Sequence, residues 1–74
     1  MSGVRKRSIH LGGKKTSISL EDEFWSAFRE IAALRNERMV TLINAVDGQR
    51  PKGLNLSSAI RLFVLRHCRT HGAP

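Results

Sequence analysis

Residues 7–20 read RSIHLGGKKTSISL, and this stretch limits the possible folds more than any other feature of the sequence. Apolar and polar residues alternate on both sides of Gly12 and Gly13, which is typical of strands that bury one face. Two glycines between such runs favour a tight two-residue hairpin turn. A two-stranded hairpin alone is barely stable in water, so helices or a second chain must cover its apolar face.

The alternation also predicts a register for this hairpin. If Leu11 lies opposite Lys14, then Ile9 lies opposite Thr16. A strand period of two then divides the side chains between two faces. The apolar face carries Ile9, Leu11, Ile18 and Leu20, and the polar face carries Lys6, Ser8, His10, Lys15, Ser17 and Ser19.

Three amphipathic segments follow the alternating stretch. The acids at 21–23 suit the positive end of a helix dipole, and the apolar spacing after them predicts a helix over 21–35. A shorter apolar stripe predicts a second helix over about 39–48, followed by turn-forming glycines and prolines. Asn55 is a good N-cap for a third helix. That helix is apolar on several sides, which favours burial by more than one neighbour, a second subunit among them.

The length of the chain favours association. A chain of 74 residues buries only a modest core, and Cys68 is its single cysteine, so no disulfide forms within it. We therefore expect oligomerisation to stabilise the fold. The sequence shows no secretory signal and no apolar run of the ~20 residues that span a bilayer. We accordingly expect a cytoplasmic protein with no membrane partner.

The charge is concentrated near the N-terminus. The net charge is +7, and residues 1–20 contain five cations and no acid. A basic segment beside a balanced body is common in nucleic-acid-binding proteins. It also suits RNA, an anionic lipid surface or a solvated tail. We assign residues 1–6 to a flexible basic arm, 7–71 to the folded domain and 72–74 to a flexible tail.

Catalytic and metal-binding patterns are weak. No nucleophile has a nearby base, so we predict neither an enzyme nor a cofactor. His67 and His71 are four residues apart and share a helix face with Cys68 beside them, but no further ligand cluster accompanies them. We therefore predict no metal site.

The polar strand face gives the sharper functional prediction. A two-stranded ribbon fits the DNA major groove, where lysine donates to guanine and serine donates or accepts. Lys15, Ser17 and Ser19 would read bases, although a merely solvated face has the same pattern. Arg5, Lys6 and Arg7 would contact phosphates, which dominate affinity.

Two longer motifs carry a family resemblance. The segments TSISLEDEFW (16–25) and NLSSAIRLFVL (55–65) frame a strand followed by helices. Over about residues 5–70 the chain resembles the ribbon-helix-helix superfamily, and in particular a small bacterial family of this fold. The resemblance implies a mainly α fold with a short β-ribbon, an extra C-terminal helix and an intertwined homodimer.

The resemblance also implies roles for individual residues. The strands of two chains pair into an intermolecular ribbon whose base readers are Lys15, Ser17 and Ser19. The start of the second helix clamps a phosphate. The DNA-phosphate set is then Arg5, Lys6, Arg7, Lys14, Arg35, Arg38, Met39, Val40 and Thr41. The dimer core is Ile18, Leu20, Phe24, Phe28, Ile60, Phe63 and Val64.

The sequence departs from the minimal family pattern in two ways. It has three predicted helices in place of two, so the phosphate clamp lies at 39–41 or, if the middle helix is an insertion, at 55–58. The strand before Gly12 competes for pairing within the chain. A folded-back hairpin would give the dimer a four-stranded sheet, too wide for the groove. We expect a homodimeric regulator that binds double-stranded DNA. The alternative is an antitoxin or adaptor whose third helix binds a partner protein.

Overall fold

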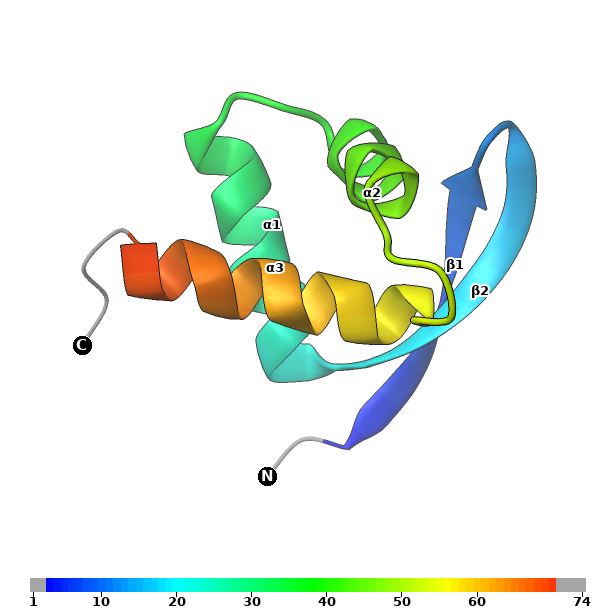
Figure 1. The fold of residues 1–74 in the computed structure, drawn as a ribbon, viewed down its shortest axis with the longest axis horizontal. Helices are drawn as coiled ribbons and strands as arrows, with labels where there is room; N and C mark the ends of the chain where they lie inside the picture. Colours follow the sequence, from blue (N-terminus) through cyan, green and yellow to red (C-terminus); the bar gives the residue numbers. More distant parts are fainter. Residues whose placement is uncertain (1–2, 71–74) are drawn as a thin grey trace.

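The alternating stretch forms an antiparallel hairpin in the computed structural model, which describes residues 3–70 (Figure 1). Strand β1 (Val4–Leu11) pairs with β2 (Lys14–Glu21), and Leu11 lies opposite Lys14, which confirms the predicted register. Gly12 and Gly13 both have positive φ, 58° and 82°, as a type I′ turn requires. Because β1 starts at Val4, residues 4–6 of the expected flexible arm lie in the strand. Residues 1–2 and 71–74 lie outside the described residues, and the expected tail, 72–74, is among them.

The ribbon of this structure is made within one chain. The family resemblance implies a ribbon shared between two chains, but here β1 occupies one edge of β2. The strand of another chain would have to meet the opposite edge of β2. At that edge Ser57 Oγ donates a hydrogen bond to the Ser19 carbonyl at 2.7 Å. The strand before Gly12, β1, is therefore the partner of β2 in this structure.

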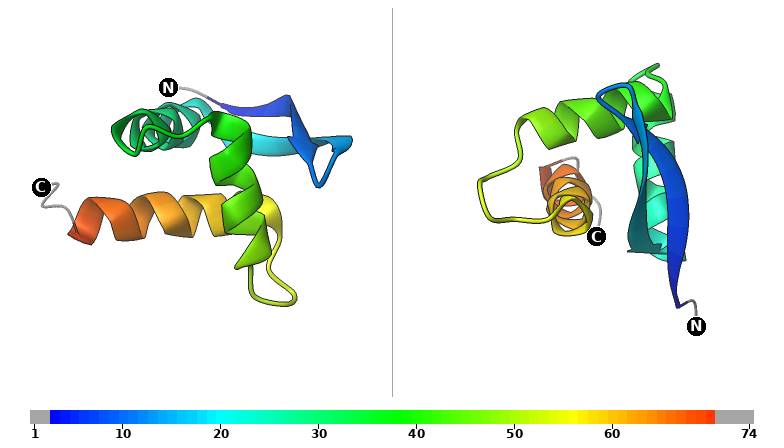
Figure 2. Two further views of the ribbon diagram at one scale, coloured as in Figure 1. Left: turned by 90° about the horizontal axis from the view of Figure 1, so that it is seen from above. Right: turned by 90° about the vertical axis from the view of Figure 1, so that its right-hand side faces the viewer.

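The three predicted helices are present. They are α1 (Asp22–Leu34), α2 (Met39–Gly48) and α3 (Leu56–Thr70), and the first two match the predicted ranges to within a residue. Helix α3 packs against α1, α2 and β2, whereas α2 also contacts β1 (Figure 1). The loop between α2 and α3 lies on the side of the helices away from the hairpin (Figure 2).

One hydrophobic core joins all five elements. Its buried members are Ile9, Ile18, Leu20, Phe28, Ile31, Ala32, Leu42, Ile43, Val46, Leu56, Ala59, Ile60 and Val64. Phe24 and Phe63 are half-buried and pack against this cluster, and the Phe63 ring meets Phe28 edge-on at 5.7 Å. All seven residues of the predicted dimer core thus pack in the core of a single chain.

The start of α3 has the predicted N-cap. Asn55 Oδ1 accepts a hydrogen bond from the Ser58 N–H at 2.8 Å. We expect Asn55→Ala to lower the free energy of unfolding by about 1 kcal/mol, because it leaves that N–H without its acceptor. Urea unfolding would measure the loss. Asn55→Asp keeps a capping oxygen and should stay close to the wild type, and an equal loss in both variants would contradict the capping role.

An ion pair joins α3 to the end of β2. Arg61 Nε donates to Glu21 Oε1 at 2.8 Å. This hydrogen bond is the main reason why the pKa of Glu21 is lowered from its ordinary value. The contact fixes the junction between β2 and α1 against the third helix. In the described part of the chain, no helix has the length and apolar character needed to cross a membrane.

Candidate nucleic-acid interface

The solvent-exposed face of the hairpin brings the predicted base readers together. Lys15, Ser17 and Ser19 are exposed on β2. Their partners across the ribbon are exposed as well, and these are His10, Ser8 and Lys6. The face thus presents six polar side chains, two of them lysines, and no carboxylate among the six. We call these six residues the ribbon face.

Two arginines predicted to contact phosphate lie on the opposite side of the hairpin. Arg7 is paired with Ile18 in the register, and it forms an ion pair with Asp22. Its guanidinium lies 4.8 Å from the centre of the Trp25 ring, and its side chain is only 20% exposed. Arg5 Nε lies 3.4 Å from the same carboxylate. Both cations are therefore directed to the core side, away from the ribbon face.

The other predicted phosphate ligands are dispersed. Lys6 shares the ribbon face with the base readers, and Lys14 is exposed beside the turn. Arg35 lies at the C-terminal end of α1, where its Nε pairs with Glu37 Oε1 at 2.7 Å. Arg38 is the exposed N-cap residue of α2.

The start of α2 differs from the other two helix starts. No side chain caps it and its first turn has no acid, whereas α1 has two acids there and α3 has its asparagine cap. The hydrogen bond from Leu42 N to Arg38 O is the first of the helix, so the N–H groups of Met39, Val40 and Thr41 precede it. Such N–H groups and the helix dipole favour an anion. The start of α2 is therefore better suited to hold an anion than the capped start of α3.

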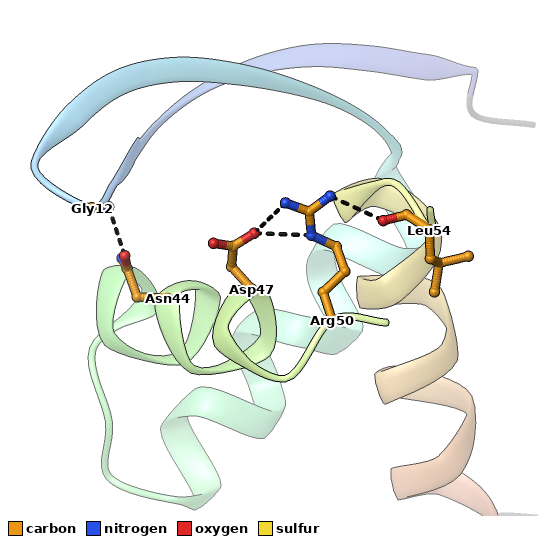
Figure 3. A network of polar contacts seen from close by, with 5 residues as sticks. All are labelled: Gly12, Asn44, Asp47, Arg50 and Leu54. Carbon is orange, nitrogen blue, oxygen red and sulfur yellow. Dashed lines mark hydrogen bonds and ion pairs between the residues drawn. The ribbon is translucent and has the colours of Figure 1, made fainter. Parts of the chain in front are cut away.

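Asn44 connects the tip of the hairpin to α2. Its Oδ1 accepts from the Gly12 N–H at 2.8 Å (Figure 3), and its Nδ2 donates to the carbonyl of His10 at 3.2 Å and of Val40 at 2.7 Å. The ribbon and the first turn of α2 are thus held together through one side chain. Asn44 was not predicted to belong to the site, and its one signal in the sequence is a polar residue within an apolar helix.

A family model described as a ribbon-helix-helix domain matches residues 4–68. The chain belongs to the ribbon-helix-helix family. Proteins of this family are generally DNA-binding transcription regulators or antitoxins. Comparisons with curated proteins and with solved structures gave no match.

The two-stranded ribbon followed by three helices is consistent with the ribbon-helix-helix pattern plus an extra C-terminal helix, α3. The added helix places His67 and Cys68 in its last turns, and His71 lies outside the described residues. Within residues 3–70, no three histidine, cysteine or acidic side chains are grouped closely enough to hold a metal ion.

Proposed function

We propose that this ribbon-helix-helix protein is a transcription regulator that reads the DNA major groove with the ribbon face. The observation that carries the proposal is the composition of that face, where every side chain is polar and exposed and none is acidic. A carboxylate there would repel the phosphates on both sides of the groove. The face instead offers two lysines and three serines, which donate to base edges.

The width of the hairpin suits this role. The major groove admits a two-stranded β-ribbon, and the chain forms such a ribbon by itself. The reading set therefore extends from Lys15, Ser17 and Ser19 on β2 to their neighbours on β1. In this arrangement Ser8 lies beside Ser17 and His10 beside Lys15.

The phosphate contacts would come from the start of α2. Its free N–H groups, with Arg38 adjacent, would hold one phosphate while the ribbon face lies in the groove. Asn44 would fix the angle between these two contacts, since it bonds both segments. Lys6 and Lys14 would add phosphate contacts at the margins of the ribbon.

A selection of bound sequences from random double-stranded DNA, with affinities measured at two salt concentrations, tests the proposal. We expect an enriched site whose affinity falls steeply with salt, because phosphate contacts release counterions. A steep salt dependence without any enriched sequence would reduce the interaction to electrostatics and contradict base reading.

If the start of α2 clamps a phosphate, an acid placed there should weaken DNA binding without lowering the stability of the protein. Thr41→Glu places an acid in the first turn of α2, where it should leave the melting temperature unchanged or slightly raised. The same charge should weaken DNA binding roughly tenfold or more, because it repels the clamped phosphate. Thr70→Glu makes the same change of net charge at the far end of α3 and should weaken binding much less. Equal losses in the two variants would contradict the clamp.

We further propose that the protein acts as a homodimer, as ribbon-helix-helix proteins typically do when they bind DNA. When only folded chains associate into a dimer, the thermal midpoint increases with protein concentration. We therefore expect the thermal midpoint to rise as protein concentration is increased a hundredfold. Light scattering should give twice the mass of one chain. A concentration-independent midpoint and a monomer mass would contradict the dimer.

The alternative of an antitoxin or adaptor receives less support. It was motivated by the apolar surface of residues 56–65, but most of this surface packs in the core of the chain. Of the large apolar side chains there, Leu62 and Leu65 remain 37% and 49% exposed. Purification as a monodisperse protein without a partner would count further against this alternative.

A further inference from the structure

A pocket of about 200 Å³ lies between α2, α3 and the loop that joins them. Its apolar wall includes the buried side chains of Leu42 and Val46 and the half-buried ring of Phe63. Arg35, Arg50, Arg66 and Gln49 complete the lining, and no carboxylate contributes to it. The pocket thus combines an apolar interior with exposed cations at its margin.

The cations of the pocket differ in how they are engaged. Arg50 is held on one side by Asp47, at 2.7 Å, and on the other by the Leu54 carbonyl, at 2.9 Å (Figure 3). These contacts close the loop from α2 to α3, so Arg50 forms part of the wall. Arg66 is exposed, and its side chain makes no ion pair or hydrogen bond with the rest of residues 3–70.

Arg35 forms an ion pair with Glu37 but keeps part of its side chain exposed to solvent. Its ion pair with Glu37 leaves the side chain 47% exposed, and its guanidinium lies 5.8 Å from the centre of the Phe63 ring. Because Phe63 also lines the pocket, Arg35 and the apolar wall meet at that ring. A guanidinium donates hydrogen bonds to a carboxylate, often two in parallel, and Arg35 retains N–H groups for one.

We propose that this pocket binds a small organic carboxylate with an apolar body. The carboxylate would pair with Arg66 and Arg35, and the body would lie against Phe63 and its apolar neighbours. The volume is below the ~300–1,000 Å³ of pockets for drug-sized ligands, so the ligand is of the size of an aryl-acetic or short branched aliphatic acid.

A second copy of the chain is a poor occupant of the pocket. Its net charge is +7, and of its six acids Glu21, Asp22, Glu37 and Asp47 are already ion-paired within the chain. DNA on the ribbon face is no competitor either, since the loop that walls the pocket lies on the other side of the helices (Figure 2). The proposed site is therefore separate from the ribbon face, and the one residue it shares with the predicted phosphate contacts is Arg35.

An NMR titration of the ¹⁵N-labelled full chain tests the proposal without any DNA. The probes are sodium phenylacetate, sodium 4-methylpentanoate and the neutral 2-phenylacetamide, all at constant ionic strength. We expect saturable shifts, confined to the lining of the pocket, with at least one carboxylate. Phenylacetamide has nearly the same shape but no charge, and it should bind at least tenfold more weakly.

Three variants locate the site. Arg66→Gln removes the unpaired guanidinium and should weaken carboxylate binding roughly tenfold, whereas Arg69→Gln removes a neighbouring exposed cation that does not line the pocket and should have little effect. Ala45→Trp should fill the pocket from its exposed margin and abolish binding while the chain stays folded. The proposal is overturned if no carboxylate saturates, if the amide binds equally well, or if Arg66→Gln and Arg69→Gln behave alike.

Discussion

Replacing Leu20 with aspartate is expected to unfold the protein at neutral pH. Leu20 is 0% exposed and lies where β2 meets α1 and α3. Removing its side chain costs about 2–5 kcal/mol, and an aspartate there must in addition be buried without a partner or take up a proton. A chain of 74 residues has a total stability of only about 4–11 kcal/mol, so the substitution removes most or all of it.

The adjacent residue supplies a matched control for this substitution. Ser19→Asp makes the same change of charge one position earlier, but its side chain is on the exposed ribbon face. We expect it to keep the circular dichroism spectrum and a cooperative melting transition, while Leu20→Asp loses both. If Leu20→Asp melts cooperatively within a few degrees of the wild type, Leu20 does not lie in the core that this structure describes.

The contrast between these neighbours follows from a period of two, which was readable in the sequence. Alternation fixes which side chains share a face, and two glycines that accept positive φ fix the turn, so a hairpin formed within the chain has a predictable register. The helices were similarly predictable, since acids mark the start of α1 and Asn55 marks the start of α3. These signals are local, and each needs only a few consecutive residues.

The orientation of Arg5 and Arg7 was not foreseen. They were assigned to phosphate as part of a basic N-terminal segment with no acids nearby in the sequence, and that assignment stays a prediction. The alternation places them beside Leu20 and Ile18 on the inner side, where both form an ion pair with the one carboxylate of Asp22 while Arg5 stays 70% exposed. Residue type suggested a phosphate contact, whereas the alternation of side chains along β1 sets the face on which each arginine lies.

Other parts of the site could not be predicted, because they depend on contacts between distant segments. Asn44 bonds Gly12 and His10 across more than thirty positions of sequence, and no local pattern marks such a pair. The pocket likewise needs Arg35 and Arg66 from two different helices. The apolar excess of α3 suggested a second chain, but the helix packs against both other helices and β2 of the same chain.

Replacing Lys15 and Ser17 together with alanine is expected to flatten discrimination between the selected site and random DNA. Each good base contact contributes about 1–3 kcal/mol of discrimination, so the preference should fall by roughly tenfold to a hundredfold or more. Non-specific binding should largely remain, because the phosphate contacts at α2 are untouched. Competition binding with both DNAs at one salt concentration measures the two effects. Lys52→Ala, in the loop on the far side of the helices, is the matched loss of an exposed lysine.

The same experiment on β1 decides which ribbon enters the groove. Lys6 and Ser8 lie opposite Ser19 and Ser17 in the intrachain hairpin, so their replacement with alanine should also reduce discrimination if this hairpin is the reading element. If instead the β2 strands of two chains form the ribbon, the β1 variants should affect only overall affinity. A protein in which neither pair of substitutions changes discrimination does not read DNA with this face, because the two pairs remove four of its six side chains, two from each strand.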